Sequence, residues 1–75
     1  MKVRFSRHAR RRAKLYRIPE SSVEAVVTRE SPAQGQHELV VDVPEMRYPL
    51  KIIVVVEDDV ATVITNYPLK KAAAK

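Results

Sequence analysis

The sequence contains no cysteine and no long hydrophobic run. Without cysteine there can be no disulfide scaffold and no thiolate zinc site, which leaves His8 and His37 as the only imidazole ligands for a transition metal. The longest apolar run, Ile52 to Val56, is far shorter than the roughly 20 residues that a helix needs to cross a bilayer. We therefore expect a cytoplasmic protein with no metal, no other cofactor and no membrane contact.

The 75 residues are too few for two hydrophobic cores. Hydrophobic residues make up 45% of the chain and charged residues 31%, as in a globular domain. We expect one domain over residues 1–68 and a basic tail over residues 69–75 that has little to bury. A domain of this size has a free energy of unfolding of about 5 kcal/mol or less, which favours a homodimer or a stabilising partner.

Positive charge is concentrated at the N-terminus. The first 17 residues hold eight bases and no acid, and residues 18–75 hold six bases and nine acids, so that +8 and −3 give the net charge of +5. Such an asymmetry indicates an anionic partner. RNA is the polyanion that we expect.

Two helices are predicted first. Residues 3–5 form a short strand or an extended lead-in, and Ser6 is a suitable N-cap for a helix that runs to about Arg17. Pro19 suits a first helical turn, and Ser21 and Glu24 have capping-box spacing, so a second helix is expected from residue 19 or 21 to Arg29. The only glycine lies in the turn that follows, residues 31–35.

Strands follow the helices. Apolar alternation predicts a strand over residues 39–43, and Leu50 to Glu57 is rich in β-branched residues, which indicates a central strand. A last strand is expected from Val60 to Tyr67, before Pro68. The sequence thus predicts an α+β fold in which both helices pack on one face of a three- to four-stranded antiparallel sheet.

The N-terminal helix is predicted to separate cations from apolar side chains. At about 100° per residue, five bases share an arc of about 120°, and apolar residues occupy the opposite arc. The apolar arc consists of Ala9, Ala13, Leu15 and Tyr16. Five bases without an interleaved acid favour polyanion binding over the alternative, a merely solvated face. The expected nucleic-acid-binding residues are Arg4, Arg7, Arg10, Arg11, Lys14, Arg17 and Lys70.

Two polar residues, His8 and Arg12, lie within the predicted apolar arc, one turn apart. An unpaired buried charge is costly, so one interpretation pairs Arg12 with a carboxylate of the chain and leaves His8 as a half-buried structural residue. The candidate carboxylates are Glu24, Glu38 and Asp42. In the other interpretation, His8 carries a proton and Arg12 binds a phosphate. Both interpretations stay open at this point.

The last strand offers two further candidates. Thr65 and Tyr67 alternate onto one of its faces, and Lys70 follows shortly after it. Their residue types are also common in ordinary strands. If this face looks toward His8, the two hydroxyls and the ammonium group would surround a bound phosphate.

These residues resemble the pattern of the bacterial family known as domain of unknown function 4258. The similarity covers nearly the whole chain and is carried by short motifs: Phe5-Ser6-Arg7-His8-Ala9 with Arg12, then Ile18, Ile53 to Val56, and Val63-Ile64-Thr65-Asn66-Tyr67-Pro68. The segment from Arg17 to Pro19 departs from the family's usual glycine turn.

The family is similar in layout to the barnase, EndoU, colicin and RelE-like nuclease superfamily. The resemblance implies a RelE-like fold and metal-independent RNA cleavage, with His8 as general acid or base, Arg12 as phosphate clamp, and Thr65 and Tyr67 as contacts from the sheet.

Sequence and resemblance together predict an RNA-binding protein. In one hypothesis it is a metal-independent endoribonuclease of the toxin type. The alternatives are a noncatalytic RNA- or ribosome-binding module and a protein-interaction domain. The expected partners are RNA, including ribosome-bound RNA, an antitoxin protein and a second copy of the chain.

Overall fold

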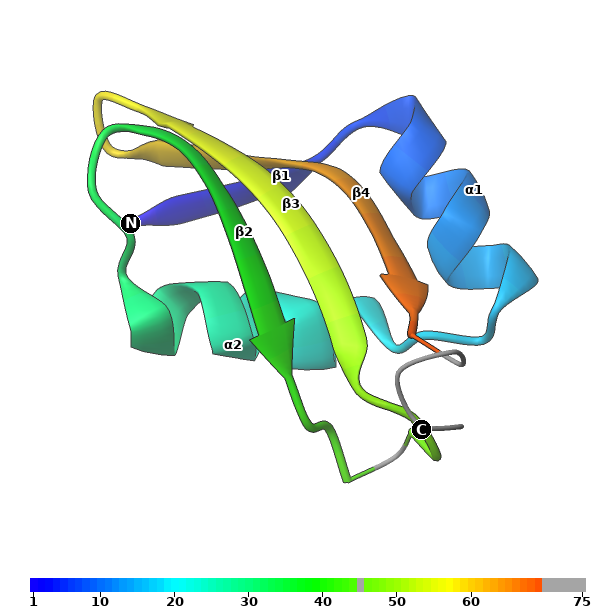
Figure 1. Ribbon diagram of the computed structural model, residues 1–75. Coiled ribbons are helices and arrows are strands. Elements are labelled where there is room, and N and C mark those ends of the chain that lie inside the picture. The colour runs from blue at the N-terminus through cyan, green and yellow to red at the C-terminus, as the bar shows by residue number, and fades with distance from the viewer. Residues whose placement is uncertain (45, 70–75) are drawn as a thin grey trace.

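The computed structural model of the chain describes residues 1–44 and 46–69 and has the α+β fold that the sequence predicts (Figure 1). The elements in chain order are β1 (Lys2–Phe5), α1 (Arg7–Leu15), α2 (Glu20–Glu30), β2 (Gly35–Val41), β3 (Leu50–Glu57) and β4 (Val60–Pro68). No helix in the described ranges has the length and apolar character that crossing a membrane requires.

The sheet has the strand order β1-β4-β3-β2. Strands β2, β3 and β4 pair antiparallel, and β3 is central, as expected. Strand β2 covers residues 35–41 and not the predicted residues 39–43. The prediction of a wholly antiparallel sheet is wrong, because β1 pairs with β4 in parallel. This pairing covers only residues 60–63 of β4. Helix α1 then runs beside the rest of β4, so β1 and α1 contact the same strand one after the other.

Both helices contribute to one core on one side of the sheet. In Figure 1, α2 lies behind the sheet and α1 lies beside β4. Alternate residues of β3 are buried, and they join the buried side chains of the two helices. The core includes Ala9 and Ala13 of α1, Val23, Val26 and Val27 of α2, and Leu50, Ile52, Val54 and Val56 of β3. The prediction that the helices share one face of the sheet agrees with this single cluster.

The helix ends are formed partly as expected. The Ser6 hydroxyl accepts a hydrogen bond from the Ala9 N–H at 3.0 Å and caps α1. Helix α1 ends where Arg17 adopts a left-handed conformation with φ of 56°, which glycine more often occupies. The capping box predicted at the start of α2 does not form, because the helix begins at Glu20 and its N-cap, Pro19, has no side chain that can cap it.

A β-bulge at Ile64 decides which side chains of β4 face the core. Ile53 pairs with Thr65, whereas the next residue of β3 pairs with Val63, so Ile64 has no partner on β3. Without the bulge, Thr65 would share the face of Val63. The bulge instead turns Asn66 into the core, where its Nδ2 atom donates to the Ala9 carbonyl at 3.4 Å.

The bulge also anchors α1. The Ser6 backbone N–H donates to the Val63 carbonyl at 3.0 Å, and the Ser6 hydroxyl donates to the Ile64 carbonyl at 2.8 Å. One residue therefore caps the helix and fastens its first turn to β4. The opposite face of the sheet carries neither α1 nor α2, and we refer to it as the helix-free face.

Candidate functional site

Three exposed cations occupy the outer face of α1 over its whole length. Arg7, Arg11 and Lys14 are all exposed, and we call these three residues the α1 basic surface. At 1.5 Å per residue they span about 10 Å along the helix axis. The first turn of α1 contains no acidic residue. Among the described residues, none of the three makes a hydrogen bond or an ion pair with another side chain.

Arg10, which was predicted to belong to the same surface, has a different environment. Its Nη1 atom lies 2.9 Å from Oε1 of Glu20, and its guanidinium carbon lies 5.7 Å from the centre of the Phe5 ring. The side chain therefore bridges α1, β1 and the start of α2. Glu20 thus offsets part of the charge of Arg10, although 60% of the arginine side chain is exposed.

Two further predicted cations lie outside the α1 basic surface. Arg4 is exposed on β1, where it pairs with Thr62 and so points to the helix-free face. Arg17 is exposed at the left-handed residue that ends α1. Neither has an ion pair within the described part of the chain. Lys70, the remaining predicted cation, lies outside the described residues.

His8 does not lie in the buried stripe of α1, and the prediction that its side chain points inward is wrong. The side chains that turn inward are those of Ala9, Arg12, Ala13 and Tyr16, at the spacing of three and four residues typical of one helix face. His8 is exposed, and Leu15, predicted to be apolar core, has 68% of its surface exposed. The imidazole is therefore accessible from solvent.

Arg12 is half-buried without a carboxylate. Its Nη1 atom donates to the Tyr16 hydroxyl at 3.4 Å, a long hydrogen bond to a neutral group one turn away. None of the three candidate carboxylates pairs with it, and Glu38 instead binds Lys51. The interpretation that pairs Arg12 with an internal carboxylate is therefore wrong for the carboxylates of the described residues. Since a guanidinium has five N–H donors, most of those of Arg12 are available to an anion.

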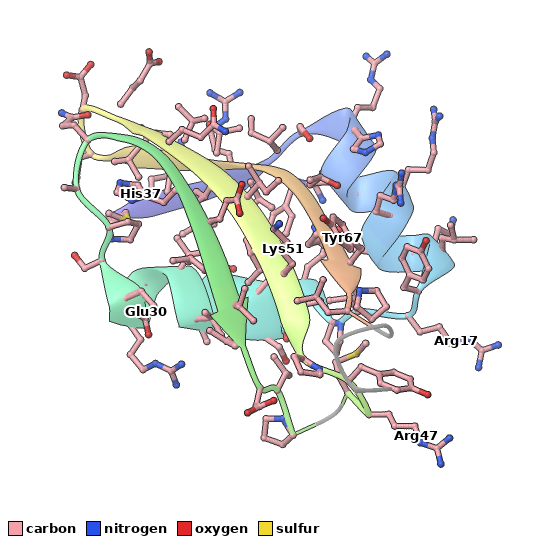
Figure 2. All side chains as sticks on the ribbon, in the orientation of Figure 1. Arg17, Glu30, His37, Arg47, Lys51 and Tyr67 are labelled. Atoms are coloured by element: carbon pink, nitrogen blue, oxygen red, sulfur yellow. The ribbon has the colours of Figure 1, made fainter. Side chains whose placement is uncertain are left out.

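Thr65 and Tyr67 lie on the helix-free face because of the bulge in β4. Tyr67 stands opposite Lys51 in the β3–β4 register, and Figure 2 labels these two side chains on their neighbouring strands. The Oγ1 atom of Thr65 is buried and has no hydrogen-bond partner. Within the described ranges, no hydrogen bond or ion pair joins either residue to His8 or Arg12. The structure thus places the four predicted catalytic residues in two groups, on α1 and on the sheet.

The sheet group includes two residues that the sequence did not assign to a site. The Lys51 ammonium lies 3.1 Å from Oε1 of Glu38, so a polar cluster of Glu38, Lys51 and Tyr67 crosses three strands. The hydrogen bond and the charge of Glu38, together with Tyr67, raise the pKa of Lys51 above its ordinary value. Lys51 therefore stays charged at neutral pH. The β2–β3 register brings Glu38 and Lys51 together, and the bulge in β4 places Tyr67 beside Lys51.

A hollow of about 180 Å³ lies elsewhere, between α2 and the segment that follows β2. Its polar lining comes from Ser22, Arg29 and Asp42, none of which is a predicted site residue. It is smaller than the roughly 300 Å³ at which ligand pockets usually begin. Residues 1–44 and 46–69 contain no group of three or more His, Asp or Glu side chains that could hold a metal ion.

No protein-family model, no curated protein and no solved structure matches this chain. The candidate site therefore depends on its own geometry: the α1 basic surface, with Arg12 and His8 beside it.

Proposed function

We propose that the protein binds RNA through the α1 basic surface. The observation that carries the proposal is that Arg7, Arg11 and Lys14 are exposed on one helix face without a carboxylate partner in the described part of the chain. Arg10, on the same helix, differs from these three residues because the Glu20 carboxylate lies 2.9 Å from its guanidinium group. Cations that lack such partners gain most from contact with backbone phosphates.

Hydroxyl and imidazole groups beside the surface favour RNA over DNA. Tyr16 and His8 flank Arg12, and both side chains can hydrogen-bond a ribose 2′-hydroxyl, which DNA lacks. A single strand suits a surface only about 10 Å long, because it can bend its backbone along one short helix. The proposed ligand is therefore single-stranded RNA, held mainly through its phosphates.

The first prediction concerns the salt dependence of binding. Fluorescence anisotropy with a labelled single-stranded RNA should give a log Kd that rises linearly with log salt concentration, with a slope of about 2 or more, because each neutralised phosphate contributes about 0.7. A DNA strand of the same sequence serves as the comparison and should bind more weakly. Affinity that does not change between low and high salt would contradict phosphate binding.

A second candidate function is metal-independent RNA cleavage, and the half-buried Arg12 favours it. An arginine held against a tyrosine hydroxyl, with no carboxylate among the described residues, can stabilise the charge of a pentacoordinate phosphate. His8, one turn away, would accept the proton of a ribose 2′-hydroxyl as its oxygen attacks the adjacent phosphorus. The bond from phosphorus to the 5′-oxygen then breaks, water protonates the leaving oxygen, and a cyclic 2′,3′-phosphate remains.

The second prediction tests this candidate. RNA incubated with the protein in EDTA should be cleaved by the wild type, and the His8→Ala variant should lose about 100-fold or more of the rate, as expected for a general base. His37→Ala is the matched control, because His37 contacts the Ala33 carbonyl at 2.7 Å, on the far side of the sheet from α1. Equal cleavage rates for wild type and His8→Ala would remove His8 from the mechanism, and a wild type that leaves the RNA intact would contradict cleavage and leave RNA binding as the function.

A further inference from the structure

Strand β2 forms an open edge of the sheet. It pairs with β3 over seven residues, and no other described segment pairs with its outer side. Figure 1 shows β2 at the front of the sheet, with α2 behind it. The outward-pointing N–H and C=O groups of such an edge are free to pair with another strand.

The edge at β2 lacks the features that normally prevent strand pairing. It contains no proline, no bulge and no lysine along Gly35–Val41. The other edge, β1, is protected: it has only four residues, and two of them are the exposed cations Lys2 and Arg4. The contrast indicates that the β2 edge is suited to association and the β1 edge is not.

Apolar side chains border the open edge on both faces. Leu39 and Val41 lean toward the core but are only half-buried, and Val40, on the helix-free face, has 58% of its surface exposed. An added strand would cover all three. The edge therefore offers both backbone hydrogen bonds and apolar surface to a partner.

The charges of β2 indicate which partner fits. Its only formal charge is Glu38, which Lys51 of the same chain already neutralises at 3.1 Å. The edge therefore offers no cation to RNA and no net charge that would select a strongly charged protein. It also lies at the opposite side of the sheet from β1, so two chains of net charge +5 can meet there with their α1 helices far apart.

We propose that the chain forms a two-fold dimer in which the β2 strands of two copies pair antiparallel and make one eight-stranded sheet. A self-complementary, nearly neutral edge fits a second copy of itself, as in most symmetric homodimers. The dimer presents one α1 basic surface at each end of the continuous sheet. A single strand pair buries little area, so the dissociation constant is on the order of 10 µM.

The third prediction tests this interface in the full chain. Sedimentation velocity from 1 µM to 1 mM should show a monomer–dimer equilibrium, and Val40→Glu should raise the dissociation constant by about tenfold or more, because each β2 edge would then carry a second carboxylate beside Glu38 and Lys51 can neutralise only one of the two. Val40 has 58% of its surface exposed on the helix-free face, so the substitution removes no core side chain and the variant should fold. Ile64→Glu is the matched control: it makes the same change at an exposed bulge residue of β4, away from the edge, and should leave dimerisation unchanged.

Hydrogen exchange identifies the strand involved. Above the dissociation constant, all interior amides of β2 should be protected, whereas in the monomer the outward-pointing alternate amides should exchange rapidly. A wild type that stays monomeric at 1 mM, a dimer with unprotected β2 amides, or a dimer equally stable in both variants would each overturn the proposal. None of these results depends on whether the protein binds RNA.

Discussion

Replacing Arg7, Arg11 and Lys14 together by glutamine is expected to weaken binding to single-stranded RNA about 100-fold at 0.1 M salt. Each lost phosphate contact removes a counterion-release contribution that changes the dissociation constant about fivefold at this salt concentration, and the factors for the three contacts multiply. The three side chains are exposed and, among the described residues, form no hydrogen bond or ion pair with another side chain, so the triple variant should keep the fold and the melting temperature of the wild type. Fluorescence anisotropy with the same RNA measures the loss.

The matched control removes three positive charges elsewhere. Lys2, Arg29 and Arg47 are exposed, and none of them lies on α1. Lys2 is at the start of β1, where its backbone N–H binds the Asp59 carbonyl, and Arg29 pairs with Glu30. Changing all three to glutamine should weaken binding only a few-fold, through net charge alone. If both triple variants lose affinity equally, the helix face has no special role.

The second large effect concerns stability. Ile52→Ala should lower the free energy of unfolding by about 3 kcal/mol, since the residue is fully buried in the central strand and leaves a cavity in the core. A domain of this size has about 5 kcal/mol in total, so the variant should be partly unfolded near 37 °C. Urea denaturation followed by circular dichroism measures the difference.

Leu15→Ala is the control for this substitution. Leu15 has the same side-chain volume as Ile52 but is 68% exposed on α1, so its replacement should change the free energy of unfolding by less than about 0.5 kcal/mol. Comparable losses for the two variants would mean that β3 is not the centre of the core.

Patterns that repeat along the chain made most of the fold predictable. The run of β-branched residues from Leu50 to Glu57 indicated the central strand with its bounds. Ser6 marked the start of α1, because a hydroxyl before a helical stretch can accept a backbone N–H. These features depend on neighbours within a few residues, which the sequence displays directly.

The phase of α1 was harder to predict because alanine defines its buried stripe. Ala9 and Ala13 are small, so Leu15 carried more weight in locating the apolar arc and shifted it toward His8. In the structure the stripe follows the alanines, which allow α1 to pack closely on β4 through the Asn66 hydrogen bond. Close approach of backbones is a tertiary feature that hydrophobicity alone does not indicate.

The positions of Thr65 and Tyr67 also depended on a non-local feature. Strict alternation does not reveal the bulge at Ile64, which moves both residues to the helix-free face. The bulge forms where Ser6 binds the carbonyls of Val63 and Ile64, across more than 50 residues of sequence. Likewise, the parallel direction of β1 follows from how α1 docks, and no pattern within residues 2–5 encodes it.

The number of phosphates held by α1 is the quantity that tests the central claim most directly. It is obtained from the slope of log Kd against log salt concentration for the wild type and for the triple variant of Arg7, Arg11 and Lys14. We expect the variant's slope to be smaller by about 2, at about 0.7 for each lost contact to single-stranded RNA. The same slope in both proteins would contradict the assignment of RNA binding to this helix.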